Sequence, residues 1–239
     1  MSNDPVLAHA RGLWEELARV PASFGPPGSV GVVSSPQSSM CPPGWVGVVR
    51  LGGSAIVTAP SQAIATMLGE TFSNLSVDAM VDAQTVSALL PVTEVLGPAT
   101  LGYLRESDFR PTSDGPLVNE LAIGHPALRE LERSAGDDDA AEAGLAEITS
   151  PTFVVRDNGG VVAASGYRLW PRQTAHLSVL AAPGWRGQGL GRAVASRAVA
   201  HALGAGLLPQ WRARPVDSRR VAVALGFREL GAQLSFKLA

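Results

Sequence analysis

Two periodicities of apolar positions predict different elements in the first sixty residues. Apolar residues spaced three and four apart follow the pair Asp4-Pro5 and end before Pro21, which predicts an amphipathic helix that docks on a core. Residues 44–60 form two short β-rich runs around a central Gly52-Gly53 pair. Such a pair between β-rich runs predicts a hairpin. The chain therefore opens with a helix followed by paired strands.

The pattern changes again further along. Ser61 and Asp82 each precede a helical stripe and can cap its N-terminus, and residues 92–104 return to a strand pattern. Residues 105–116 are rich in proline, glycine and aspartate, so we expect a domain boundary there. This divides the chain into an N-terminal α/β region, residues 1–115, and a second domain, residues 116–239. From residue 117 the pattern predicts the order β-α-α-β-β-β-α-β-α-β.

Composition and charge narrow the classes of protein. Of 239 residues, 46% are hydrophobic and 17% charged, which is typical of a folded globular chain. From Trp170 to the end there are ten basic residues against two acidic ones, although the whole chain has a net charge of -2. This part suits an anionic ligand. A pI near 6.1 and the lack of a dense Arg/Lys run argue against nucleic acid.

The cysteine and histidine content and the apolar runs exclude disulfide, metal and membrane-spanning classes. The single cysteine, Cys41, excludes an intramolecular disulfide framework and a cysteine metal cluster, and the four histidines are scattered. No apolar run reaches 18 residues. We therefore expect a cytoplasmic protein that uses no metal and binds neither membrane nor nucleic acid.

Residues 182–195 combine four glycines with two arginines between an expected strand and an expected helix. A helix start presents unpaired N–H groups and a partial positive charge, and Gly187, Gly189 and Gly191 would let the backbone approach a phosphate. The segment lacks the Lys-Ser/Thr pair of a Walker A loop and the third glycine of the dinucleotide fingerprint. A phosphate cradle is the favoured interpretation, and a plain turn is the alternative.

The residues 186–191, RGQGLG, resemble the Arg/Gln-x-x-Gly-x-Gly/Ala motif of the GNAT acetyltransferase superfamily. Residues 177–183 look like the fourth strand of that family, and 218–227 look like its later helix with the closing Leu-Gly-Phe. The resemblance extends over 117–239. The region before it is similar to the extra N-terminal α/β region of a GNAT subgroup, and this N-terminal region could itself be a degenerate GNAT-like unit. It implies an α+β fold whose mixed, mostly antiparallel central sheet is flanked by helices.

The resemblance also implies an acyl-CoA site. Backbone amides of the loop would hold the pyrophosphate, and the edge of the preceding strand would pair with the pantetheine arm. The implied cofactor-binding residues are Val179, Leu180, Ala181, Arg186, Gly187, Gln188, Gly189, Leu190, Gly191, Arg192 and Ser218.

Two positions depart from the family pattern. The tyrosine that protonates the departing sulfur in many GNAT enzymes corresponds to Ala222, and the preceding asparagine corresponds to Pro215. Tyr167 is a candidate acid, with an aromatic that packs on the sheet as the alternative, and water could also serve.

The candidates for base lie on the strands. His176 shares a strand face with Ser178 by two-residue alternation and could take the proton of an amine. A structural strand histidine is the alternative, and Glu120 on the first strand of the domain is a second candidate. The catalytic candidates are therefore His176, Tyr167 and Ser178.

The resulting hypothesis is an N-acetyltransferase that moves acetyl, or another short acyl group, from acyl-CoA to a primary amine by direct attack in a ternary complex. The expected partner is a small-molecule or peptide amine, and homodimer formation is left open. The rival hypothesis is a catalytically weak acyl-CoA-binding module, which the departures at Pro215 and Ala222 favour.

Overall fold

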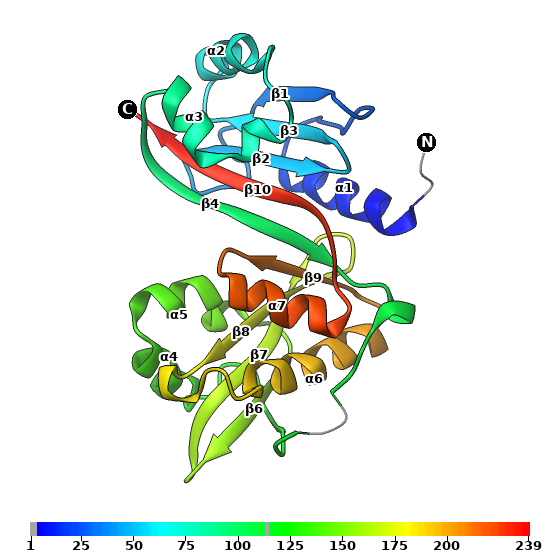
Figure 1. Cartoon of the computed structure of the whole chain (residues 1–239), viewed down its shortest axis with the longest axis vertical. Coiled ribbons are helices and arrows are strands. Elements are labelled where there is room, and N and C mark those ends of the chain that lie inside the picture. Colours follow the sequence, from blue (N-terminus) through cyan, green and yellow to red (C-terminus); the bar gives the residue numbers. More distant parts are fainter. Residues whose placement is uncertain (1–3, 113–114) are drawn as a thin grey trace. The chain divides into compact units, whose positions relative to one another are not determined.

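The computed structural model describes residues 4–112 and 115–239, and the chain divides into two compact units (Figure 1). Unit 1 consists of Met1–Gly102, Ala213–Pro215 and Glu229–Ala239, and unit 2 of Tyr103–Arg212 and Val216–Arg228. The compact units thus interleave along the chain, whereas the predicted domains do not. The division at residues 115 and 116 stays a prediction about domains.

Unit 1 contains three helices and a sheet. The helices are α1 (Pro5–Leu17), α2 (Gln62–Phe72) and α3 (Ala83–Leu89). The strands, in their order across the sheet, are β1 (Val30–Ser34), β3 (Ser54–Ala59), β2 (Val46–Leu51), β10 (Arg228–Leu238) and β4 (Val92–Tyr103). Strand β1 is parallel to β3, while β2 is antiparallel to both β3 and β10.

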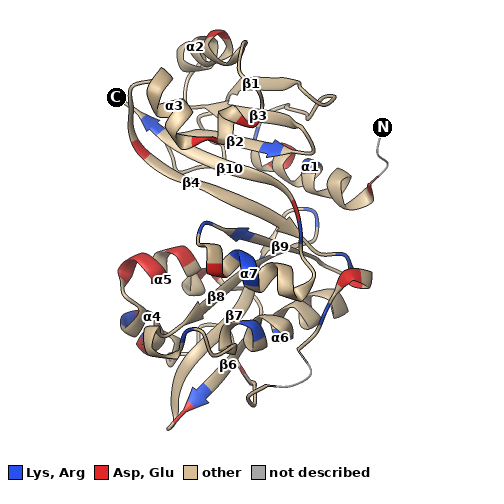
Figure 2. Cartoon of the chain, viewed as in Figure 1, with Lys and Arg blue, Asp and Glu red and all other residues tan. Residues whose placement is uncertain are grey.

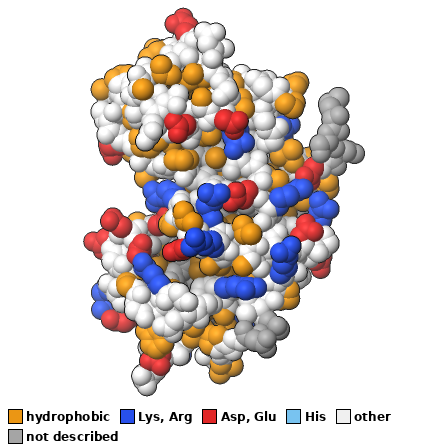
Figure 3. Space-filling view, in the orientation of Figure 1, with side chains coloured by type: hydrophobic (Ala, Val, Ile, Leu, Met, Phe, Trp, Pro, Cys, Tyr) orange, Lys and Arg blue, Asp and Glu red, His pale blue; other side chains and the backbone are white. Residues whose placement is uncertain are grey.

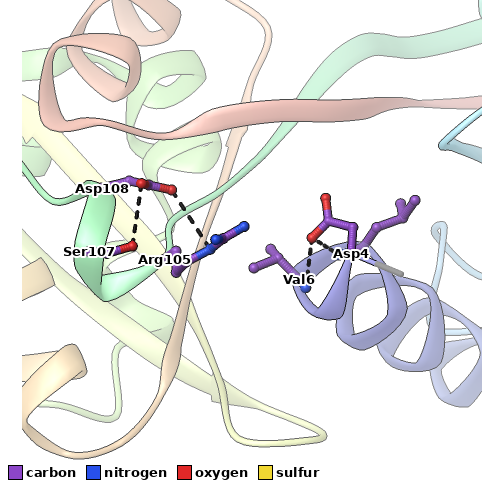
Figure 4. Close-up of polar contacts among 6 residues, drawn as sticks. Asp4, Val6, Arg105, Ser107 and Asp108 are labelled. Atoms are coloured by element: carbon purple, nitrogen blue, oxygen red, sulfur yellow. Dashed lines mark hydrogen bonds and ion pairs between the residues drawn. The ribbon is translucent and has the colours of Figure 1, made fainter. Parts of the chain in front are cut away.

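The helix starts of unit 1 are those that the sequence predicts. The Asp4 carboxylate accepts the Val6 N–H at 3.0 Å at the start of α1 (Figure 4). Ser61 accepts from Ile64 at the start of α2, and Asp82 from Thr85 at the start of α3. Each cap satisfies an N–H group that has no partner within its helix. The hairpin is also confirmed, because Leu51 pairs with Ser54 across the predicted glycine turn.

Unit 2 carries the predicted strand and helix order. Its strands lie in the order β9 (Leu208–Ala213), β8 (Thr174–Ala181), β7 (Gly160–Trp170), β6 (Thr152–Asp157) and β5 (Asn119–Leu121). Its helices are α4 (Leu128–Ala135), α5 (Asp137–Ala143), α6 (Leu190–Gly204) and α7 (Val216–Leu225). Neighbouring strands are antiparallel except for β8 and β9, which are parallel. With β10, the order β-α-α-β-β-β-α-β-α-β is confirmed.

One boundary differs from the predicted one. The sequence places a short helix over 125–132, but α4 begins at Leu128. The His125 Nδ1 accepts the Ala127 N–H, and Leu128 N–H donates to the His125 carbonyl, so a turn precedes the helix.

Helices cover both faces of the unit 2 sheet. Ala163 of β7 packs in a cluster with Val194 of α6, whereas the adjacent Ala164 packs with Leu131 of α4. Adjacent strand residues point to opposite faces, so α6 and α4 lie on opposite sides of the sheet. The predicted α+β class, with a mostly antiparallel sheet flanked by helices, is confirmed. Among the described helices, none has the length and apolarity needed to cross a membrane.

Candidate functional site

The glycine-rich loop connects the end of β8 to the start of α6. Gly187 and Gly189 have φ of 75° and 78°, a left-handed conformation that favours glycine. A Cβ at either position would meet nothing within 4 Å, so the space in front of the loop is not filled by the chain itself. A Cβ at Gly191 would lie 3.7 Å from Val179 Cγ1, an ordinary contact. The left-handed turns, rather than crowding, explain why glycine stands at 187 and 189.

The N-terminus of α6 has no side-chain cap. Gly189 is its N-cap residue and has no side chain to accept from the first N–H groups, and the first turn contains no acidic residue. Helices α1, α2 and α3, by contrast, each begin at a side-chain cap. The first N–H groups of α6 and the positive end of its dipole are therefore available to an anion. This geometry fits a pyrophosphate.

The two arginines of the loop are held by other parts of unit 2. Arg186 donates from Nε to the Ala181 carbonyl at 3.2 Å and pairs with Asp139 of α5 at 2.5 Å. Arg192 donates to the Ala224 carbonyl of α7 at 3.3 Å. Figure 2 draws the acidic positions along α5 as red ribbon, and Asp139 is one of the three in its first turn. Both guanidinium groups therefore fix the position of the loop as well as adding charge to it.

Strands β8 and β9 pair only over a short length. The parallel ladder runs from Thr174 with Leu208 to His176 with Gln210, after which β8 continues to Ala181 paired with β7 alone. The two strands thus form a fork whose last paired residues are His176 and Gln210. Within the described part of unit 2, no strand pairs with the second edge of β8 beyond this fork.

The backbone direction along that free edge follows from one hydrogen bond. The Ala182 N–H donates to the Val162 carbonyl of β7, and backbone groups alternate in direction along a strand. Val179 and Ala181 therefore direct their N–H and C=O groups to the free edge, whereas those of Leu180 face β7. Of the three strand residues that the family pattern implies, two can pair with an extended ligand through the backbone, and Leu180 instead packs in the core beside α4.

His176 lies at the fork with a strongly altered pKa. Its Nδ1 is 2.5 Å from Gln210 Oε1, and the Trp170 ring stacks on the imidazole at 4.0 Å between centroids. Burial, followed by the positive charge of Arg212, lowers the pKa of His176 to about 3, although the Gln210 hydrogen bond opposes that shift. The imidazole is therefore neutral at pH 7.

The family comparison agrees with this geometry. Residues 151–232, which run from β6 into β10 and include the loop and the fork, match the family model described as GNAT acetyltransferase. These residues form a GNAT acetyltransferase domain. No curated protein matches the chain.

Solved structures similar to this chain include three from different bacteria. A putative acetyltransferase of the GNAT family from Novosphingobium aromaticivorans is 22% identical. The match covers 61% of this chain and 65% of that chain, with a TM-score of 0.48. A GCN5-related N-acetyltransferase from Kribbella flavida is 16% identical, with coverages of 64% and 62% and a TM-score of 0.47. The yncA protein of Salmonella typhimurium, solved with its cofactor acetyl-CoA, is 21% identical, with coverages of 53% and 95% and a TM-score of 0.38.

The chain thus spans less than two thirds of the length of the first two structures.

The three catalytic candidates of the GNAT domain do not lie on one face. His176 and Ser178 share a face of β8, as predicted, but Tyr167 pairs with Leu177 and lies on the opposite face, against α6. The Tyr167 hydroxyl is 2.9 Å from His201 Nδ1 of α6, and burial raises the pKa of Tyr167. Tyr167 is thus engaged in the packing of α6 and is separated from His176 by the sheet.

The later helix of the GNAT domain shows the departures from the family pattern. The Ser218 hydroxyl accepts the Trp211 Nε1–H at 3.0 Å, so it holds the strand β9 indole against α7. Ala222, at the family tyrosine position, is only 6% exposed and presents no titratable group. Pro215 belongs to the other compact unit. No side chain at these two positions can donate a proton.

Sequence reasoning missed one residue of the fork, one on the neighbouring strand β7, and one on the other side of the sheet. Gln210 contacts His176, Trp170 stacks on it, and His201 contacts Tyr167. The sequence did contain a signal for Gln210, because this polar residue directly follows the apolar run Leu207-Leu208-Pro209 at the start of a predicted strand. Its pairing with His176 depends on the alignment of β8 with β9, which the sequence pattern does not give.

Proposed function

We propose that the GNAT domain moves an acetyl or another short acyl group from acyl-CoA to a primary amine by direct attack in a ternary complex. The observation that carries this proposal is the coincidence, at one end of β8, of a free strand edge and an uncapped helix N-terminus. Acyl-CoA has a pantetheine arm with amides and an anionic pyrophosphate, which require those two features side by side. The GNAT match of residues 151–232 supports the same ligand.

Individual residues then take distinct roles. The amides of Gly187, Gly189 and Gly191 and of the first turn of α6 would hold the pyrophosphate, and the edge groups of Val179 and Ala181 would pair with the pantetheine amides. Gln188 is exposed on the loop, and its amide bonds only to the Gly184 carbonyl at 3.4 Å. When bound, acyl-CoA supplies a thioester whose thiol has a pKa of roughly 8.5, so a dedicated proton donor is not essential.

His176 is the residue we propose to contact the amine. With a pKa of about 3 it does not store a proton at pH 7, but a neutral imidazole accepts a hydrogen bond. It would orient the amine and pass its proton on to water. Ser178 lies two residues further along the same face, while the Tyr167 hydroxyl is already bonded to His201.

A second candidate function has a specific observation behind it. Ala222 is buried where the family pattern has its acid, and the described tyrosines are a buried Tyr103 and the His201-bonded Tyr167. A catalytically weak acyl-CoA-binding module would have this combination of an intact cradle and no acid. Release of free thiol from acetyl-CoA across a panel of amines separates the two functions: turnover favours the enzyme, and binding without turnover favours the module.

The cradle itself is tested by a charge placed on it. Gly189→Asp puts a carboxylate at the N-terminus of α6, so we expect acetyl-CoA affinity, measured by calorimetry, to fall at least about tenfold. Gly206→Asp is the matched control, because Gly206 has a similar φ of 71° and a Cβ there would also meet nothing within 4 Å. Equal affinity in both variants, or no acetyl-CoA binding by the natural chain, would overturn the proposed site.

A further inference from the structure

A row of polar residues lies on one face of the unit 2 sheet at the fork. Arg168 is opposite His176 in the β7–β8 register, and His176 is beside Gln210 in the β8–β9 register. Arg212 follows Gln210 by two residues and so shares its face. We call Arg168, His176, Gln210 and Arg212 the fork cluster. All four belong to unit 2.

The fork cluster contains a hydrogen-bond acceptor on His176 and a donor on Gln210. An amide oxygen can only accept, so the contact between Gln210 Oε1 and His176 Nδ1 places the imidazole hydrogen on Nδ1. This leaves His176 Nε2 with a lone pair. Gln210 is fully buried, and its Nε2 has no hydrogen-bond partner within the described chain. A buried donor without a partner destabilises the fold unless water or a ligand oxygen accepts from it.

The charge at the fork cluster is positive. The positive charges of Arg212 and, more weakly, of Arg168 lower the pKa of His176. Arg168 also forms an ion pair with Glu147. The basic side chains that Figure 3 shows near α6 and α7 lie on the other face of the sheet, because Trp211, between Gln210 and Arg212, points toward α7. A positive potential repels a polycation, attracts a carboxylate and lowers the pKa of a nearby amine. The last effect increases the fraction of the uncharged, nucleophilic amine.

We infer that the acceptor is an amine with a carboxylate on the adjacent carbon, that is, an α-amino acid, and not a polycationic amine. The amine N–H would donate to His176 Nε2, a carboxylate oxygen would accept from Gln210 Nε2, and Arg212 would balance the remaining charge. In the transfer, the amine nitrogen forms the new C–N bond, the thioester C–S bond breaks with its electron pair on sulfur, and the amine proton passes to water. This inference rests on the proposed acyl transfer.

The test begins with the natural chain. Acetyl-CoA binding is first measured by calorimetry, so that loss of the donor site is recognised separately. Free-thiol release is then measured with glycine, L-leucine, L-phenylalanine and L-glutamate, with the α-amides of the same four, and with spermidine and kanamycin. We expect at least one amino acid to exceed its own amide by about tenfold or more in kcat/KM, and both polycations to be inactive.

Variants then test whether the fork cluster causes the preference for an amino acid over its amide. Arg212→Gln should lower kcat/KM for the preferred amino acid about tenfold, mainly through KM, and lower it for the amide by a clearly smaller factor, with partial recovery in Arg212→Lys. Arg220→Gln is the matched control, since Arg220 lies exposed on α7 and pairs with Asp217. Gln210→Met removes the donor, so it should weaken the acid and its amide alike and shift the His176 ring ¹⁵N resonances as the Nδ1–H tautomer loses its partner.

Several results would overturn the inference. Preference for spermidine or kanamycin contradicts the charge argument, and equal loss of acid and amide in Arg212→Gln contradicts the role of Arg212. Acetyl-CoA binding without turnover of any panel member removes the acceptor inference and leaves the donor site standing. Failure to bind acetyl-CoA at all removes the proposed function and this inference together.

Discussion

At the scale of single residues, His176 derives its chemistry from neighbours that are distant in sequence. Gln210, 34 residues further along the chain, accepts from its ring, Trp170 stacks on it, and Arg212 disfavours its charged form. Desolvation adds to that charge effect, so a histidine that would titrate near neutral pH is kept uncharged. The sequence placed His176 and Ser178 on one strand face, but it could not give the protonation state.

The altered His176 pKa makes a stability prediction. Because the folded pKa of about 3 lies below the ordinary value of 6.5, the unfolded chain binds a proton in this range and the folded chain does not. Stability is thus lost as pH falls from 6.5 toward 3, by up to about 1.4 kcal/mol per pH unit from this group.

His176→Asn removes the titrating ring and keeps an N–H donor for Gln210. The free energy of unfolding, measured in urea between pH 7 and pH 4, should fall less steeply in the variant than in the natural chain. Other titrating groups are common to both proteins, so the difference between the two slopes isolates His176. Parallel slopes would contradict the lowered pKa.

At the scale of elements, the end of α7 shows why the Leu-Gly-Phe segment has its sequence. Gly226 has a φ of 100°, and a Cβ there would lie 2.0 Å from the Asp108 carbonyl oxygen. Asp108 belongs to a short turn in which it pairs with Arg105 (Figure 4). Leu225 and Phe227, on either side, are buried. The glycine therefore ends the helix and permits a close approach of two backbone segments.

Gly226→Ala should destabilise the chain by roughly 3 kcal/mol or more, because the backbone strain and the clash with Asp108 add together. Gly204→Ala is the control at the end of another helix, where a Cβ meets nothing within 4 Å, and we expect it to be neutral or slightly stabilising. Thermal or urea unfolding of both variants checks this. A Gly226→Ala variant as stable as the control would refute the close approach.

At the scale of the whole molecule, the final strand belongs to unit 1 although α7 before it belongs to unit 2. Strand β10 pairs with β2 from Gly231 with Leu51 to Phe236 with Val46. Leu234 and Phe236 are fully buried in a core cluster with residues of β2, β3 and α2. The last eleven residues therefore complete the core of the N-terminal unit, which a single boundary near residue 115 does not convey.

This assignment predicts a large effect at the C-terminus. Phe236→Ala should lower the free energy of unfolding by roughly 3–5 kcal/mol, since it leaves a cavity in the unit 1 core. Val216→Ala on the exposed side of α7 should change it by less than about 0.5 kcal/mol. Hydrogen exchange should then locate the loss of protection of Phe236→Ala in β2 and β3. Unchanged protection there would contradict the role of β10.

The sequence by itself determined the helix caps, the glycine turns, the order of elements after residue 117 and the position of the loop before α6. These features depend on contacts within a few residues, which an apolar period and a capping side chain reveal. Only the tertiary structure decided that His176 meets Gln210, that Arg186 pairs with Asp139, that Tyr167 lies across the sheet from His176, and that β10 returns to unit 1. Each of these depends on strand register and on helix packing between segments far apart in the chain, which local patterns leave free.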